Sequence, residues 1–424
     1  MIRHSMVLMG LAFWFVPPAL VGQEIGVVSL DEAVRLFAVN NQELRGARAR
    51  VAEAVGMARQ AGAFPNPLLT ASHEPLSGGG TSYSESYLTL SQRFELPGER
   101  GARADAGDWT ARAAQFRLIA DSARLAFEVK ETFVETANAQ ERLEVIGRVA
   151  QAFRDAARIA SERFDAGDIS LYELLRIRVE RARYETLAAQ ADVSVGVAQR
   201  SLALLVSPSE RAHRIAAAAL PGDSPPPVSA AILAAPTAER RLELAGARAE
   251  VEAFEARARL ARAERVPDLT ATGGVKRQSD GLRGGFLGLS LPLPLFDRGG
   301  GALDAASAGV VGSGERLERT RSELENDALG AAEAYRAHLQ RAELVTEEED
   351  QGASGAGDLL DIARVAYDEG EMELIELLDA AEAMYQARTA EARLRADLWV
   401  SYFNLERALG GFETAGGSAT EDLP

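Results

Sequence analysis

Two stretches of this chain, 203 residues apart, are clearly similar to each other. Residues 163–175 read RFDAGDISLYELL and residues 366–378 read AYDEGEMELIELL, with six of the thirteen positions identical. The similarity extends outward in register, because the tetrapeptide GARA at 46–49 recurs at 246–249. Solenoid repeats are much shorter, about 20–50 residues. The sequence therefore predicts two copies of one unit of roughly 200 residues, related by internal pseudo-symmetry.

The first 22 residues have the pattern of a secretory signal peptide. Arg3 and His4 precede an apolar run over residues 6–16, and helix-breaking Pro17 and Pro18 follow. No later window holds about 18 uncharged apolar residues, the length that a membrane-spanning helix needs. We expect an exported chain without a transmembrane helix.

Composition excludes several classes of function. The chain has no cysteine, so disulfides and thiol catalysis are excluded, and its net charge of -17 argues against nucleic acid as a partner. After the leader only His73, His213 and His338 remain, and none has ligand spacing with another. We expect no catalytic site, no cofactor and no metal site, and therefore no enzyme. The abundance of Ala, Leu, Glu and Arg is typical of long helices and coiled coils.

Each half of the chain begins with a helical pattern. Ser29 and Glu32 form a capping box, in which hydroxyl and carboxylate satisfy free backbone N–H groups, and apolar residues follow at helical spacing. This helix is expected to run to about Ala63, where two prolines stop it. Its counterpart in the second half is expected from about Ser229 to Glu264.

Two proline-free stretches, 100–166 and 302–369, predict very long helices. At about 1.5 Å per residue each would be about 100 Å long, which implies coiled-coil packing. Gly167 and Gly370 follow them, in the position that favours a left-handed C-cap. The return helices expected after these glycines span 170–207 and 371–409.

Between the first helix and the long helix of each half, the apolar period changes from 3.6 to 2. This alternation predicts two β-hairpins, over 67–96 and 268–295, whose strands of about ten residues suit a tilted crossing of a bilayer. Thr89, Ser91 and Arg93 lie on the polar side of the first hairpin. The residues expected to face lipid are Leu88, Leu90, Phe94, Leu289, Leu291 and Leu293.

The chain is thus expected to be mainly α with a small β part. Four strands cannot close a barrel alone, and lipid tolerates no open strand edge, so membrane strands would require several chains; three copies would pool twelve strands. A periplasmic coiled-coil scaffold, with the hairpins as packing elements, is the alternative. The expected divisions are a signal peptide (1–22), a first repeat (23–219), a linker (220–228), a second repeat (229–410) and a disordered tail (411–424).

Two motifs after the hairpins carry a resemblance to a known family. LSQRFELPGER at 90–100 and LPLPLFDR at 291–298 resemble the strand-to-helix segments of the CzcC-like branch of the TolC-type outer membrane efflux proteins. The resemblance, together with the duplicated layout, covers nearly all of the chain after the leader.

The resemblance implies a homotrimer with a 12-stranded barrel in the outer membrane lipid and an α-helical barrel that extends through the periplasm. Such a protein is the exit duct of a tripartite efflux system, with a periplasmic adaptor protein and an inner-membrane RND-type pump as partners. Metal cations or drugs would be the exported substrates. A duct for type I protein secretion remains an alternative.

The resemblance also implies roles for residues near the two glycine turns. Gly167, Asp168, Gly370 and Glu371 would lie at the periplasmic tip, where the adaptor docks. Acidic positions of the closed aperture fall on Glu376, Asp379 and Glu173, and Met372 replaces a residue that is often basic in the family. The alternatives are a solvated helix face for Glu376 and Asp379, and a helix-capping role with Ser170 for Glu173.

Overall fold

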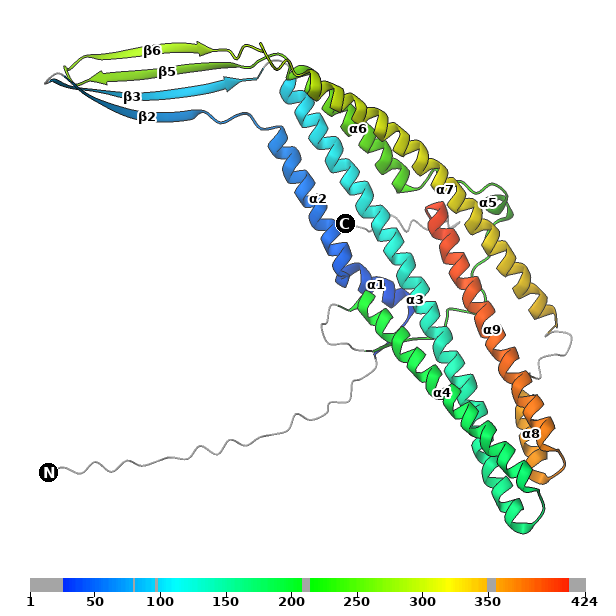
Figure 1. Cartoon of the computed structure of the whole chain (residues 1–424). Coiled ribbons are helices and arrows are strands. Elements are labelled where there is room, and N and C mark those ends of the chain that lie inside the picture. The colour runs from blue at the N-terminus through cyan, green and yellow to red at the C-terminus, as the bar shows by residue number, and fades with distance from the viewer. Residues whose placement is uncertain (1–25, 79–80, 96–97, 208–213, 349–355, 412–424) are drawn as a thin grey trace, which may run out of the picture.

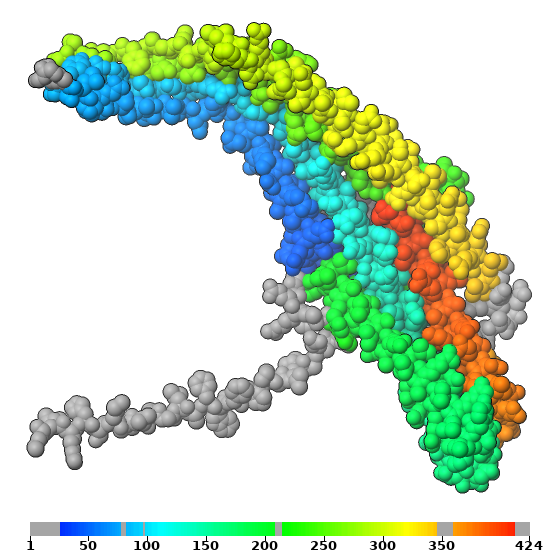
Figure 2. Space-filling view, in the orientation of Figure 1, coloured from blue at the N-terminus to red at the C-terminus, as the bar shows by residue number. Residues whose placement is uncertain are grey.

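The computed structural model describes residues 26–78, 81–95, 98–207, 214–348 and 356–411. It is a long, curved assembly of helices with one β-sheet projecting at one end (Figure 1). In the space-filling view the sheet and the helical part form one arched body (Figure 2). The expected signal peptide, 1–22, and nearly all of the expected disordered tail, 411–424, lie outside the described residues.

The projecting sheet has four antiparallel strands in the order β2-β3-β5-β6. Each hairpin supplies two neighbours, and the hairpins join through β3 and β5, where Leu88 pairs with Val275 and Leu90 with Gly273. Strands from the two halves of the sequence therefore form one continuous surface. The strands are β2 (Leu68–Gly78), β3 (Thr81–Phe94), β5 (Leu269–Gln278) and β6 (Arg283–Ser290).

The second hairpin is shorter than expected. Strand β6 ends at Ser290, so Leu291 and Leu293 follow the strand instead of lying within it. Pro292 and Pro294 explain the difference, because proline has no N–H to donate to a strand ladder. The expected hairpin range of 268–295 is thus corrected at its C-terminal end.

The expected helix from Ser29 to Ala63 is two helices, α1 (Leu30–Asn40) and α2 (Gln42–Ala61). Asn41 separates them in an extended conformation. Its side-chain oxygen accepts from the Leu44 N–H at 3.0 Å, and its amide donates to the Leu205 carbonyl at 3.2 Å. A capping asparagine held by a distant helix therefore ends one helix and begins the next.

The expected helix from Ser229 to Glu264 is also interrupted. It consists of α5 (Ala230–Ala234) and α6 (Leu242–Ala263), with a loop between them. Pro236 lies in this loop and disfavours helical dihedrals at the residue before it, and Ala235 has φ -138° and ψ 68°.

The longest helix of the described residues is α3 (Glu99–Ala166), where a helix over 100–166 was expected. The return helices are α4 (Leu171–Val206) and α9 (Leu374–Leu409). The expected helix over 302–369 corresponds to α7 (Gly300–Glu348) and α8 (Ala356–Glu369), and residues 349–355 between them lie outside the described part.

A small parallel sheet lies near the middle of the helical part. Strand β1 (Gly26–Val28) pairs with β4 (Ile215–Ala217), and neither strand was expected from the sequence. Val28 and Ala217 pack with Phe37, Phe133 and other residues of α1, α3 and α4.

The largest buried cluster lies between the hairpin of α3 and α4 and the hairpin of α8 and α9. Across the described segments, every helix is too short or too polar to cross a bilayer.

Candidate functional site

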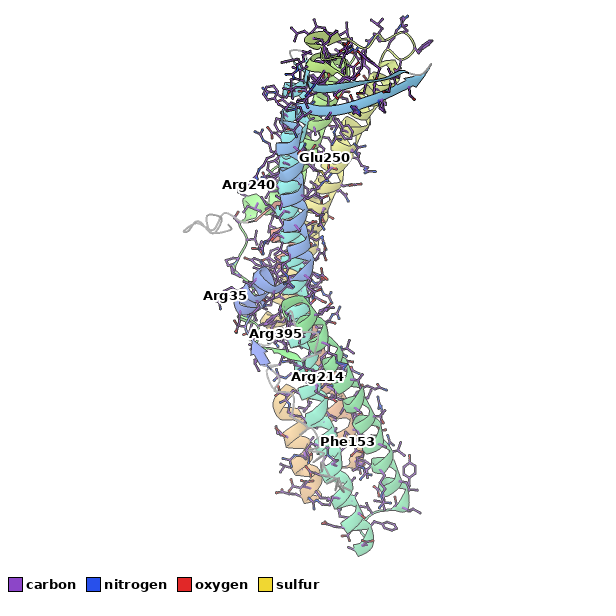
Figure 3. The ribbon with its side chains drawn as sticks, turned by 90° about the vertical axis from the view of Figure 1, so that its left-hand side faces the viewer. Arg35, Phe153, Arg214, Arg240, Glu250 and Arg395 are labelled. Atoms are coloured by element: carbon purple, nitrogen blue, oxygen red, sulfur yellow. The ribbon has the colours of Figure 1, made fainter. Side chains whose placement is uncertain are left out.

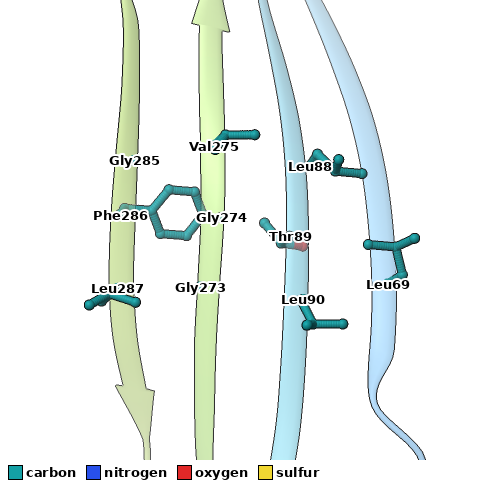
Figure 4. A pocket seen from close by; sticks show the side chains of 10 residues that line it. All are labelled: Leu69, Leu88, Thr89, Leu90, Gly273, Gly274, Val275, Gly285, Phe286 and Leu287. Carbon is teal, nitrogen blue, oxygen red and sulfur yellow. The ribbon is translucent and has the colours of Figure 1, made fainter.

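The two faces of the four-stranded sheet differ in chemistry. Cross-strand partners point to the same side of a sheet, so the register places Leu90, Gly273 and Leu287 on one face. Figure 4 shows leucines of this face on three strands. Leu287 is 93% exposed and Leu289 is 75% exposed. This apolar face comprises Leu69, Leu88, Leu90, Phe94, Val275, Leu287 and Leu289.

The glycine-rich second hairpin leaves the apolar face uneven. Leu90 and Leu287 flank Gly273, and together with Leu88 they border an open depression of about 640 Å³ (Figure 4). In a monomer this surface has no cover among the described residues. An uncovered apolar surface of this extent indicates contact with lipid or with another chain.

The opposite face of the sheet is polar and hydrogen-bonded. Glu85 accepts a hydrogen bond from Gln278 at 2.8 Å, pairs with Lys276 at 2.8 Å and also accepts from the Tyr87 hydroxyl. The Ser91 and Thr272 hydroxyls lie 3.0 Å apart. These contacts join β3 to β5 and therefore join the two halves of the chain.

Thr89, Ser91 and Arg93 of β3 lie on this polar face as their alternation predicts, whereas the sequence predicts no role for Glu85 or Lys276. Strand alternation alone predicts on which face Lys276 lies. It does not predict that Lys276 pairs with Glu85 on another strand.

A phenylalanine ring also lies on this polar face. The Phe286 ring covers Gly274 on the neighbouring strand, and a Cβ at Gly274 would lie 2.7 Å from that ring. Glycine is therefore required opposite Phe286.

A charged network holds the junction between the sheet and α3. Arg103 pairs with Glu95 at 2.6 Å and lies 3.6 Å from Glu99, and Arg93 pairs with Asp268 of the second half. Glu99 is 4% exposed, and burial, followed by the nearby Asp268 carboxylate, raises its pKa. Charged residues of the motif at 90–100 thus connect the end of β3 to the start of α3 and to the second half of the chain.

The turn after α3 has the geometry that its glycine predicts. Gly167 has φ 88°, and the N–H of Asp168 donates to the Arg163 carbonyl at 2.8 Å. Ser170 and Glu173 form the expected capping box, with Glu173 accepting from the Ser170 N–H at 2.8 Å. Hydrogen bonds from the backbone and the hydroxyl of Ser170 lower the pKa of Glu173. Gly167 and Asp168 are exposed.

The turn after α8 is built in the same way. Gly370 has φ 80°, and the exposed Glu371 donates its N–H to the Ala366 carbonyl at 2.9 Å. Glu376 accepts from the Glu373 N–H at 3.0 Å, so it caps α9 as Glu173 caps α4. This second capping role was not foreseen, because Glu373 replaces the Ser or Thr that usually begins such a box.

The remaining residues of the tip divide between core and surface. Asp379 is exposed, one turn after Glu376. Met372 packs against the apolar cluster that also holds Tyr367. The two glycine turns lie close together. The Arg163 side chain, from the end of α3, comes within 3.7 Å of the position that a Cβ on Gly370 would occupy. The structure therefore brings the sequence-predicted tip residues to one end of the molecule, opposite the sheet (Figure 1).

Charged groups are plentiful along the described helices. Within the described ranges, no group of three or more His, Asp or Glu side chains is placed to hold a metal ion. The side-chain view shows charged residues such as Arg35, Glu250 and Arg395 spread along the length of the helices (Figure 3).

Comparison with known proteins identifies relatives of similar length. The cobalt-zinc-cadmium resistance protein CzcC of Cupriavidus metallidurans is 27% identical over 395 residues, which cover 93% of this chain and 92% of that protein. The nickel-cobalt-cadmium resistance protein NccC of Alcaligenes xylosoxydans xylosoxydans is 30% identical over 289 residues, covering 65% and 63%.

Solved structures share the fold. The CmeC outer membrane channel of Campylobacter jejuni aligns with a TM-score of 0.76 and 19% identity, covering 92% of this chain and 87% of that one. The outer membrane protein VceC of Vibrio cholerae aligns with a TM-score of 0.70 and 21% identity, covering 90% and 96%.

The family model described as outer membrane efflux protein matches residues 33–206 and 234–411, which together make up most of the chain. These matches confirm the resemblance predicted from the two motifs. The protein belongs to the outer membrane efflux protein family.

Proposed function

We propose that three copies of this chain assemble into the exit duct of a tripartite efflux system. The protein is an outer membrane efflux channel, as its family is, and the family gives no indication of catalysis. The trimer, the barrel and the partners are the parts of this proposal that go beyond family membership.

One observation carries the assembly: the sheet has two faces and two open edges. Its apolar face is exposed, its polar face is hydrogen-bonded, and the outer edges of β2 and β6 pair with no other described strand. In lipid, unpaired backbone groups cost several kcal/mol each, so the edges must be closed by other chains. Three sheets of four strands give a twelve-stranded barrel with apolar residues outward and Glu85 and Lys276 inward.

A second surface supports association along the helices. Six apolar residues of α4 are exposed, and successive ones are 4, 4, 14, 4 and 7 positions apart in the sequence. At about 100° per residue, their side chains point within about 80° of one another around the helix axis. Such a stripe is typical of a helix that packs against a further helix. Rotational symmetry would place it against a neighbouring copy. The stripe comprises Leu171, Leu175, Val179, Val193, Val197 and Leu204.

The internal repeat is part of the proposal. Each half would contribute one hairpin to the barrel and one pair of long helices to the tube, so three chains would give an arrangement close to sixfold. Within it, the turns at Gly167 and Gly370 would alternate around the periplasmic end. We propose that Gly167, Asp168, Gly370 and Glu371 form the surface on which a periplasmic adaptor docks, with an RND-type pump beneath it.

Metal cations are the substrates that we propose. The two relatives described above are named for resistance to cobalt, zinc, cadmium and nickel. A passive duct needs no metal site of its own, and selectivity would reside in the pump. Glu376 and Asp379 of three copies, with Glu173 beside them, would supply acidic groups at the closed aperture.

The mass of the detergent-solubilised complex tests the assembly. We expect a trimer, and we expect the purified trimer to form channels in planar lipid bilayers. A protein that remains monomeric in detergent and conducts no ions would contradict the proposal.

A further inference from the structure

The apolar face of the sheet ends in a polar row near the hairpin turns. Cross-strand partners point to the same side of a sheet, and the register aligns one residue from each strand in this row. Arg277 lies two positions after Val275, so the row is on the apolar face. All four side chains are exposed, and His73 Nδ1 lies 3.0 Å from the Ser86 hydroxyl oxygen. We call these residues the arginine row; they are His73, Ser86, Arg277 and Arg283.

The two arginines of this row face each other across the β5–β6 ladder. Arg277 and Arg283 are direct partners, and like charges placed directly opposite each other destabilise a sheet. Within the described residues neither guanidinium has a carboxylate partner. Asp280, in the turn between the two strands, accepts from the Leu282 N–H at 3.0 Å. An anion between the two guanidinium groups would offset their repulsion.

The proposed barrel would place the arginine row at the edge of the hydrocarbon layer. Arginine on the lipid face of a barrel is costly at the middle of a bilayer and nearly free at its interface. The row lies beyond Leu88 toward the hairpin turns, which form the end of the sheet distant from the helices (Figure 1). The guanidinium groups would therefore lie at the level of the lipid headgroups, on the side away from the periplasm. The anion within reach there is a headgroup phosphate, which a planar guanidinium binds through two parallel N–H donors.

The depression in the apolar face adjoins the arginine row. The neighbouring row of the ladder contains Leu88, Val275 and Gly285, two residues along each strand and therefore about 7 Å away. Gly285 and Gly273 have no side chains, and the depression of about 640 Å³ extends over both of them (Figure 4). An acyl chain that descends from a phosphate at the arginines would pass over this depression.

We propose that the arginine row and the adjoining depression form a binding site for one anionic membrane lipid per protomer. The headgroup phosphate lies between Arg277 and Arg283, and an acyl chain lies over Gly285 and Gly273. The inference rests on the proposed function, since the apolar face must contact a bilayer. The site has a part for each end of such a lipid, because the arginines match the charge and the depression matches the chain.

Native mass spectrometry of the purified trimer tests the site, with phosphatidylglycerol and phosphatidylcholine as probes. We expect up to three bound phosphatidylglycerol molecules per trimer and weaker binding of the uncharged phosphatidylcholine. Arg277→Gln with Arg283→Gln should weaken phosphatidylglycerol binding by about 25-fold, about fivefold for each arginine near an anionic lipid surface. Arg158→Gln with Arg393→Gln is the matched control, since it removes two exposed arginines from α3 and α9, away from the sheet. Equal binding of phosphatidylglycerol by the two double variants overturns the site.

Gly285→Leu separates a bound lipid from a bound anion. A Cβ on Gly285 would contact only the Gly274 carbonyl, at 3.6 Å, so a larger side chain can enter the depression without a clash. We expect this variant to assemble and to bind phosphatidylglycerol more weakly, with both arginines intact. Wild-type binding by Gly285→Leu, or full displacement of the lipid by inorganic phosphate, would show that the arginines bind an anion without its chain, and overturns the lipid site.

The same preparation separates this inference from the proposed function. A protein that forms no trimer in detergent overturns the duct. A trimer that conducts ions but binds phosphatidylglycerol no better than phosphatidylcholine overturns the lipid site alone.

Discussion

At the scale of single residues, the tip is shaped by backbone capping. Gly167 and Gly370 both have positive φ, and Glu173 and Glu376 both accept a backbone N–H at the start of a return helix. Glu376 therefore has a structural role before any role in an aperture. The same residue can serve both, because Glu376 is exposed while it caps the helix.

Gly370→Ala should destabilise the folded protein. A Cβ on a left-handed residue costs about 1–2 kcal/mol, and Gly370 has φ 80°. Gly330, inside α7 with nothing within 4 Å of its Cβ position, is the control. Ala there should be neutral or stabilise by about 0.5–1 kcal/mol. Thermal unfolding in detergent compares the two, and equal melting temperatures would contradict the strained turn.

The Glu173 cap should make stability depend on pH. Its pKa is lowered in the folded state, so the ionised carboxylate stabilises the fold above its ordinary pKa of 4.5, and this contribution is lost as pH falls through the lowered folded value. Glu173→Gln keeps an acceptor oxygen but cannot ionise. The difference in melting temperature between wild type and variant should therefore be largest near neutral pH and shrink in acid. A difference that stays constant with pH would show that the charge adds nothing.

At the scale of elements, the sheet depends on alternation and on its two prolines. Leu287 and Leu289 project from the apolar face, while Phe286, Gly288 and Ser290 lie on the other. Pro292 and Pro294 end the strand, although the sequence continues to alternate with leucines at 291, 293 and 295. Leu291 and Leu293 therefore lie in the segment between the end of β6 and the start of α7. Their contact with lipid remains a prediction.

Leu289→Arg should impair assembly far more than Ser290→Arg. Arginine on the lipid face of a membrane barrel costs about 2–4 kcal/mol near mid-bilayer and less toward the interface. The neighbouring position points to the opposite, polar face, where arginine stays in water. Heat-resistant trimer in outer membrane fractions, measured by gel electrophoresis, reports assembly. Equal amounts of trimer for both variants would mean that the faces are assigned the wrong way round.

At the scale of the whole molecule, the apolar face of the sheet and the acidic residues of the two capped turns lie at opposite ends. The sheet exposes its leucines at one end, and the two capped turns lie at the other, with α3 running between them (Figure 1). In the proposed trimer the acidic residues of the tip would converge around one axis. A ring of carboxylates attracts cations and repels anions.

Neutralising the tip should therefore change the selectivity of the channel. In Glu376→Gln with Asp379→Asn, the glutamine keeps an acceptor for the Glu373 N–H, so the cap is preserved while two charges per chain are lost. We expect weaker preference for cations and weaker block by divalent cations in planar bilayers. Glu252→Gln with Glu255→Gln on α6 removes the same charge away from the tip and should leave both unchanged. Identical selectivity in the two double variants would return Glu376 and Asp379 to the role of a solvated helix face.

The sequence by itself determined the features that depend on neighbours within about four residues. The change of period from 3.6 to 2, the turns at Gly167 and Gly370, and the Ser170–Glu173 capping box are all of this kind, because helix caps and strand faces are local. Only the tertiary structure decided which distant groups meet. Asn41 breaks a helix while its amide bonds the Leu205 carbonyl, and Glu382 finds Tyr184 on another hairpin. Such contacts join residues more than 160 positions apart, and no local pattern encodes the packing that brings them together.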